Sequence, residues 1–293
     1  MSKKNFLPIM LLLIVCGSLH ADFLDDFQAA AKLQKNRKYP EAAAAFEQLG
    51  KAQKDAKLAE ICQLNAVKAL AAGRKFDDAL TAAKAIATPE IREYAEMHTY
   101  AACGKGRELK VKFKDTDISR WPDQYAYLGY HMRGSASPRA AGLKDLELAL
   151  EGCGSDWTTR DVILRELGER YVLLGRNEQA HAVLDRLIAE GAKGRSPYLA
   201  GIRAKAVLLA KEKKFDEAEQ MLARIDSKGV WKEKLQHFWF VITKAKIEAA
   251  KGNLADAEKL YDEAFAMKGI PLPVIRFQKI EAGRTCPKYK VKK

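Results

Sequence analysis

The sequence predicts an all-α protein made of repeated helix-turn-helix units, and two observations carry this prediction. A short phrase recurs along the chain, as Asn36-Arg-Lys-Tyr-Pro-Glu-Ala42, Gly73-Arg-Lys-Phe-Asp-Asp-Ala79 and Glu212-Lys-Lys-Phe-Asp-Glu-Ala218, with a looser copy in Gly252-Asn-Leu-Ala-Asp-Ala257. The alanines that open the second half of each unit recur at intervals of 37 to 39 residues, apart from one interval of 101 that holds about three periods. A fixed period of this kind, between stretches rich in alanine and leucine, is typical of a solenoid of stacked helix pairs.

The clearest copy of the unit lies at residues 167–180. It reads Leu167-Gly168-Glu-Arg-Tyr171-Val-Leu-Leu-Gly175-Arg-Asn-Glu-Gln-Ala180. Gly168 and Ala180 lack bulk where we expect the paired helices to cross closely, and Tyr171 and Leu184 fill the space on either side. Gly175 falls in the turn, where a residue free to adopt positive φ ends the first helix at little cost.

These units resemble tetratricopeptide repeats (TPR), a family of 34-residue helix-turn-helix modules, and the chain is similar to an exported bacterial member. That family has Leu-Gly, a large residue three positions later, a turn glycine and an alanine that opens the second helix, and all five positions match in residues 167–180. The resemblance covers most of residues 23–270 and implies a right-handed α-solenoid of about seven TPR-like pairs. It also implies that the first helix of each unit lines a concave groove for a protein or peptide.

The chain divides into three predicted segments. Residues 1–21 form a signal peptide, residues 22–275 the solenoid with degenerate units at about 89–151, and residues 276–293 a basic, disordered tail with four lysines in its last six residues. Within the degenerate units, residues 108–115 alternate with period two, as in a half-exposed strand, so that residues 105–118 are either extended or a short irregular second helix. The sequence leaves both interpretations open.

The N-terminal segment has the pattern of a secretory signal peptide. Lys3 and Lys4 precede a short apolar run, and small residues follow up to Ala21. We therefore expect an exported protein, periplasmic or secreted, with no transmembrane span in the mature chain. A lipid anchor on Cys16 is the lesser alternative, because Val15 stands where a lipobox has a small residue.

The net charge of the chain indicates which classes of partner it could bind. The formal charge of +13 favours anionic partners, and export makes nucleic acid an unlikely one, so that acidic proteins, anionic envelope polymers or lipids fit better. Four cysteines remain after the leader, Cys62, Cys103, Cys153 and Cys286. They are either paired in disulfides, in one of three patterns, or isolated buried thiols.

No catalytic, metal or cofactor motif is present in the sequence. The zinc-protease, phosphate-loop and dinucleotide patterns are absent, and the histidines lie far apart with no ligand at metal-binding spacing. Residues 153–157 echo a papain-type segment, but Asp156 replaces the nucleophilic cysteine. We therefore expect no enzyme and no cofactor.

The expected function is a non-enzymatic binding scaffold of the bacterial cell envelope that engages a protein or peptide, with an acidic ligand favoured. The resemblance carries its groove positions over to Phe27, Leu64, Lys68, Arg165, Arg203, Lys211 and Lys246. The alternative is a basic adaptor that binds anionic envelope polymer or lipid. Its candidate contacts are Lys105, Arg107, Lys110, Lys112, Lys114, Lys288, Lys290, Lys292 and Lys293.

Overall fold

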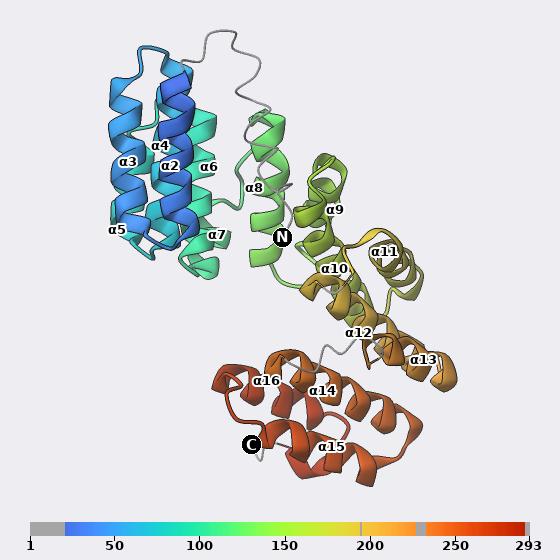
Figure 1. Cartoon of the computed structure of the whole chain (residues 1–293). Coiled ribbons are helices and arrows are strands. Elements are labelled where there is room, and N and C mark those ends of the chain that lie inside the picture. Colours follow the sequence, from blue (N-terminus) through green and yellow to red (C-terminus); the bar gives the residue numbers. More distant parts are fainter. Residues whose placement is uncertain (1–20, 194, 227–232, 291–293) are drawn as a thin grey trace. The chain divides into compact units, whose positions relative to one another are not determined.

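The computed structural model describes residues 21–193, 195–226 and 233–290. Regular secondary structure in these ranges is helical throughout, which confirms the all-α prediction (Figure 1). The chain divides into two compact units, residues 1–156 and 157–293, and each is described by itself. The predicted signal peptide, with its Cys16, lies outside the described residues except for its last position, and so do Lys292 and Lys293.

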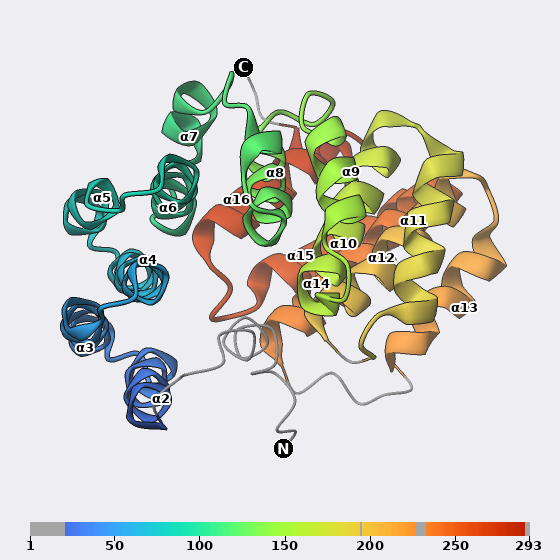
Figure 2. The same cartoon turned by 90° about the horizontal axis from the view of Figure 1, so that it is seen from above.

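Unit 1 is a row of helices in which neighbours along the chain pack on each other. We call α2, α4, α6 and α8 its first helices, and α3, α5, α7 and α9 its second helices. The first helices α4, α6 and α8 also contact one another in sequence, and Figure 2 shows α2, α4 and α6 on one side of the row and α3 and α5 on the other. The helices are α2 (Ala21–Lys35), α3 (Tyr39–Ala52), α4 (Ala56–Ala72), α5 (Phe76–Lys84), α6 (Pro89–Ala102), α7 (Gly106–Lys112), the 3-10 helix η1 (Ile118–Arg120), α8 (Asp123–Ala136) and α9 (Leu143–Gly152).

Unit 2 repeats this arrangement. Its first helices α10, α12 and α14 contact one another in sequence, and each packs against its own second helix, α11, α13 or α15. A further helix, α16, follows the last pair and packs Val274 and Ile275 against the core of the unit. The helices are α10 (Trp157–Leu174), α11 (Asn177–Glu190), α12 (Ser196–Lys211), α13 (Phe215–Asp226), α14 (Lys234–Lys251), α15 (Leu254–Ala266), α16 (Leu272–Ala282) and the 3-10 helix η3 (Pro287–Tyr289).

The recurrent phrase of the sequence has a structural counterpart in the turn between first and second helices. One residue of the turn has a positive φ in six of the pairs, at Arg37, Arg74, Gly104, Gly175, Lys213 and Gly252. The amide after it donates to the carbonyl five residues back, as in Lys38 to Leu33 and Lys214 to Leu209. This is the left-handed helix ending that glycine adopts most readily, and it confirms the turn role predicted for Gly175.

Three of these turns place a lysine or arginine where glycine is preferred, so the strain should be removable. Replacing Lys213, with φ of 62°, by glycine is expected to raise the free energy of unfolding by about 0.5–1 kcal/mol. The matched control is Gly175→Ala, at φ of 70° with nothing within 4 Å of the added Cβ, which should lower it by about 1 kcal/mol. Urea denaturation measures both changes, and a loss of stability in Lys213→Gly would contradict the assignment of strain.

Close helix crossings depend on the small residues that the sequence singled out. Ala42, Ala79, Ala180, Ala218 and Ala257, which open or lie early in the second helices, are all 0% exposed. Gly168 faces Leu184 so closely that a Cβ built on it would lie 2.4 Å from Leu184 Cδ2. Helices with bulkier residues at these positions could not approach to the same distance.

Helices α7 and α16 decide two predictions about local structure. Residues 106–112 are helical (α7), so the short second helix is correct and the extended interpretation is wrong. The prediction of a disordered tail from residue 276 is also wrong for residues 276–290, which contain most of α16 and all of η3. Tyr289 anchors this segment, because its hydroxyl donates to Asp262 Oδ1 at 2.8 Å and its ring meets those of Tyr261 and Phe265.

Candidate functional site

Unit 2 contains four of the five cations that the sequence placed in a groove. Arg165 lies on α10, Arg203 and Lys211 on α12, and Lys246 on α14, so that three consecutive first helices contribute. We call these four residues the cation cluster. Adjacent packed helices lie roughly 8–10 Å apart, which sets the spacing between their contributions.

Carboxylates lie among these cations, but they neutralise only one of the four directly. Arg165 pairs with Glu169 at 2.8 Å and with Glu166 at 3.1 Å, all on α10. Glu281, on α16, pairs with Arg284 at 3.2 Å and interacts electrostatically with Lys211 and Lys246 over a longer range.

The other three cations have no carboxylate within ion-pair distance among the described residues. Arg203 Nη1 donates to Gln236 Oε1 at 2.9 Å, and Lys211 Nζ donates to the carbonyl of Val172 at 3.1 Å. These neutral acceptors leave Arg203 and Lys211 without a direct counter-ion, and Glu169 and Glu281 act on the three cations only from a longer range.

The electrostatics of the cluster follow from this arrangement. Burial lowers the pKa of Arg203 to about 10, with Glu169 opposing the shift and Arg165 adding to it. Burial also lowers the pKa of Lys246, with Glu281 and Glu169 opposing the shift and the charge of Lys211 adding to it. Partly buried cations without an ion-pair partner, such as Arg203 and Lys246, gain stabilisation when an anion binds beside them.

Unit 1 holds its groove lysine in a different environment. Lys68, on α4, has its Nζ 5.3 Å from the ring centroid of Tyr94 and 5.9 Å from that of Tyr125. These two rings stack at 4.6 Å, and Trp121 meets Tyr94 edge-on at 6.0 Å. Burial lowers the pKa of Lys68 to about 8, and no described carboxylate forms an ion pair with it.

His98 lies on α6, one helical turn after Tyr94, and is close enough to Lys68 to be affected by its charge. Its Nδ1 is buried and has no hydrogen-bond partner, and burial together with the charge of Lys68 lowers its pKa to about 4. The neutral ring can therefore accept or donate a hydrogen bond at neutral pH. Sequence reasoning missed Tyr94, His98 and Tyr125, although the i, i+4 spacing of Tyr94 and His98 places both on one helix face.

Two of the predicted groove residues belong to the core instead. Phe27 is 4% exposed and packs its ring against Phe46 at 5.2 Å, and Leu64 is 2% exposed. Neither side chain has the exposure that a ligand contact needs, so these two assignments are wrong. The first helices bury part of the face that the resemblance assigned to the groove.

Some of the candidate polyanion contacts are exposed to solvent, and others have partners within the protein. Arg107, Lys110, Lys114 and Lys290 are exposed. Lys112 pairs with Glu96, Lys288 pairs with Asp262, and Lys105 lies 4.2 Å from the centroid of the Phe76 ring. Intramolecular partners thus already hold several of these cations.

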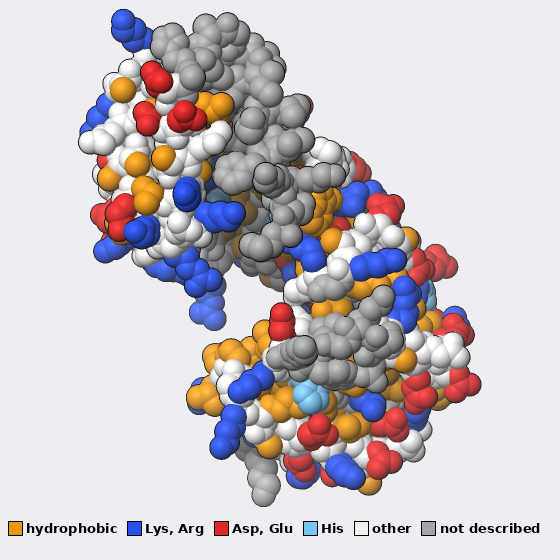
Figure 3. Space-filling model, viewed as in Figure 1, with side chains coloured by type: hydrophobic (Ala, Val, Ile, Leu, Met, Phe, Trp, Pro, Cys, Tyr) orange, Lys and Arg blue, Asp and Glu red, His pale blue; other side chains and the backbone are white. Residues whose placement is uncertain are grey.

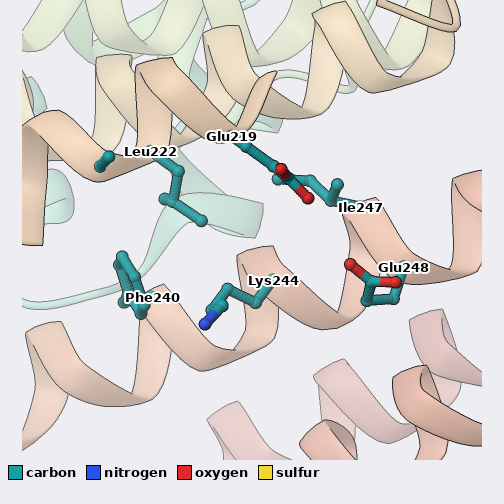
Figure 4. A pocket seen from close by; sticks show the side chains of 7 residues that line it. Glu219, Leu222, Phe240, Lys244, Ile247 and Glu248 are labelled. Atoms are coloured by element: carbon teal, nitrogen blue, oxygen red, sulfur yellow. The ribbon is translucent and has the colours of Figure 1, made fainter. Parts of the chain in front are cut away.

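Unit 2 also has two open hollows outside the cation cluster. One, of about 400 Å³, lies between α13 and α14 and is lined by Leu222, Phe240, Lys244 and charged neighbours (Figure 4). The other, of about 460 Å³, adjoins buried Lys205, whose Nζ contacts Asp185 at 2.7 Å and His181 Nδ1 at 2.5 Å. His181 in turn contacts Glu212 at 2.9 Å through Nε2, so this network is satisfied internally.

The described residues were also compared with the requirements of a reactive thiol, a metal site and a membrane-spanning helix. Cys62, Cys103, Cys153 and Cys286 are free thiols, and burial raises the pKa of Cys62 to about 12. No group of three or more potential metal ligands occurs in the ranges that the structure covers. Within those same ranges, no helix is both long enough and apolar enough to span a bilayer.

Comparison with known proteins identified no relative of this chain. No protein-family model matches the chain, and neither a curated protein nor a solved structure resembles it significantly.

Proposed function

We propose that this chain is a non-enzymatic scaffold of the bacterial cell envelope that binds an acidic segment of a protein or peptide through its first helices. The proposed architecture is a right-handed, TPR-like solenoid of seven helix pairs, and the proposed location follows from the signal-peptide pattern of residues 1–21. The observation that carries the binding proposal is that Arg203, Lys211 and Lys246 lie on neighbouring first helices and form no ion pair with a described carboxylate, while Arg203 and Lys211 donate to neutral acceptors.

Partly buried cations carry an energetic cost before any ligand binds. Arg203 and Lys246 are partly buried without an ion-pair partner, so the folded protein holds unfavourable electrostatic energy at these two positions, and exposed Lys211 adds a further positive charge beside them. A ligand carboxylate would offset that energy and form charge-assisted hydrogen bonds, which are stronger than neutral ones. An acidic ligand is therefore favoured over a basic or purely apolar one.

The alternative function, a basic adaptor that binds anionic polymer or lipid, has weaker support. It relied on solvated lysines of residues 105–114 and of the C-terminal segment, and Lys112 and Lys288 are held by Glu96 and Asp262. Exposed ion pairs contribute little energy, so these lysines are not blocked, but they offer no uncompensated buried charge.

The test uses a fluorescent acidic peptide and measures its affinity by anisotropy. Lys246→Gln is expected to weaken binding about tenfold, because it removes a partly desolvated cation from the cluster. Lys244→Gln is the matched control, since it removes the same charge from an exposed position of the same helix, and it should change the affinity less than about twofold.

Two outcomes would count against the proposal. Equal effects of Lys246→Gln and Lys244→Gln would mean that only net charge matters, as in polyelectrolyte attraction. Equal binding of the acidic peptide and a neutral peptide of the same length would mean that the cations do not select the ligand.

A further inference from the structure

The outer side of α16 carries an unusual set of exposed apolar side chains. Leu272 is 66% exposed, Phe277 52% and Ile280 53%. Exposed large hydrophobic residues gathered on one helix mark an interaction surface, so these three side chains call for a partner.

These side chains share one face with cations. At 3.6 residues per turn, the exposed positions of α16 form a continuous arc on the helix. In order around the helix they are Lys279, Leu272, Arg276, Ile280, Pro273 and Phe277.

The single acidic residue of α16 lies elsewhere. Glu281 has a side chain only 16% exposed and pairs with Arg284, on the side of the helix that faces Lys211 and Lys246. On α15, Asp262 pairs with Lys288 and accepts a hydrogen bond from Tyr289, and it interacts electrostatically with Lys279 over a longer range. Figure 3 shows hydrophobic side chains gathered over the position of α16, with Lys and Arg side chains beside them.

We propose that this outer face of α16 binds the surface of an anionic lipid bilayer, with its apolar side chains in the headgroup boundary and its cations against the lipid phosphates. Exposed apolar side chains of an interfacial helix enter the boundary between headgroups and acyl chains, and cations beside them add attraction to an anionic leaflet. The surface is separate from the cation cluster, so this inference does not depend on the function proposed above.

Charge decides between this occupant and a second copy of the chain. A symmetric dimer through α16 would bring Arg276 and Lys279 of both copies into one interface. Like charges in a desolvated interface oppose association, whereas an anionic bilayer complements them.

The experiment measures cosedimentation of the full chain with vesicles of equal parts phosphatidylglycerol and phosphatidylcholine. The variant Phe277→Ser/Ile280→Ser is expected to bind at least about tenfold more weakly, because two large apolar side chains are lost. Val111→Ser is the matched control, since Val111 is 78% exposed and also lies between lysines, on α7. It should bind as the wild type does. Residues 1–20 are common to all variants and contribute equally.

A second variant separates charge from apolar contact. Arg276→Gln/Lys279→Gln should lose most of the preference for phosphatidylglycerol over pure phosphatidylcholine vesicles. In the wild type, hydrogen exchange of residues 272–282 should slow on addition of the anionic vesicles, while that of α7 should not.

Each contrary result overturns the proposal. Equal binding of Phe277→Ser/Ile280→Ser and Val111→Ser would show that α16 does not contact lipid. Unchanged exchange of residues 272–282 would show the same. A wild-type dimer in analytical ultracentrifugation that Phe277→Ser/Ile280→Ser converts to a monomer would assign the face to a second copy instead.

Discussion

Replacing Gly168 with valine is expected to destabilise unit 2 by about 2–3 kcal/mol. A Cβ at this position would lie 2.4 Å from Cδ2 and 2.7 Å from Cγ of Leu184, and Leu184 is 0% exposed. The leucine cannot move aside without displacing its buried neighbours, so α10 and α11 must separate. Loss of packing along a helix pair is costly because protein interiors hold few voids that could absorb the strain.

Urea denaturation followed by circular dichroism measures this effect. Ala182→Val is the matched control, because Ala182 lies on the exposed side of α11 and receives the same side chain. It should change the free energy of unfolding by less than about 0.5 kcal/mol. A similar stability of Gly168→Val and Ala182→Val would mean that the two helices do not cross as closely as the structure indicates.

Replacing Lys68 with methionine is expected to stabilise the protein, by about 1–2 kcal/mol at pH 7. Burial lowers the pKa of this lysine from 10.5 to about 8, and a shift of that size corresponds to about 3 kcal/mol against the charged folded form. Loss of the contacts with the rings of Tyr94 and Tyr125 offsets about 1 kcal/mol of the gain. A residue that costs stability where it stands is typical of a binding position.

The pH dependence of the free energy of unfolding tests independently whether Lys68 destabilises the folded protein. Because the pKa of Lys68 is lower in the folded state, the unfolded chain binds more protons between pH 8 and 10.5, and wild-type stability gains from this group as pH rises through that window. Below pH 8 the full penalty applies, and above 10.5 it disappears. The advantage of Lys68→Met should therefore be constant below about pH 8 and shrink toward pH 10.5.

Lys57→Met provides the comparison, since Lys57 is exposed on the same helix. It should leave stability within about 0.5 kcal/mol of the wild type at every pH. A destabilised Lys68→Met would instead assign Lys68 a structural role.

The helical elements could be predicted from the sequence because the repeat makes each one visible several times. The turn phrase at residues 36–42, 73–79 and 212–218 marks the same left-handed ending in each case. The positions of Gly168 and Ala180 depend on contact between neighbouring helices of one pair, which are also neighbours in sequence. Local determinants of this kind can be recognised without knowledge of the tertiary structure.

The ambiguity at α7 has a simple geometric cause. Leu109 and Phe113 are 1% and 3% exposed, whereas Val111 between them is 78% exposed. Positions i and i+4 lie on the same side of both a strand and a helix, so an alternating segment this short fits both periods. The exposure of Val111 distinguishes the two, and exposure cannot be read from residue type.

The candidate site was less accessible to sequence reasoning. Assignment of Phe27 and Leu64 to a groove relied on equivalent positions in a family, but their exposure depends on how each first helix rotates against its neighbours. In the C-terminal segment, the lysines suggested disorder, while Leu272, Phe277 and Ile280 carried a helical pattern within and before it. The high lysine content of this segment therefore drew attention away from the spacing of its apolar residues.

The spacing of the cation cluster also constrains the sequence of a peptide that could occupy it. Arg165, Arg203 and Lys246 come from three successive first helices, α10, α12 and α14, which packing places roughly 8–10 Å apart. An extended chain advances about 3.3 Å per residue, so its acidic side chains would meet successive helices when they recur about every third residue. A peptide with the same composition but its acids in one contiguous block would reach fewer of these cations. The order of residues in the ligand, and not its net charge alone, would then set the affinity.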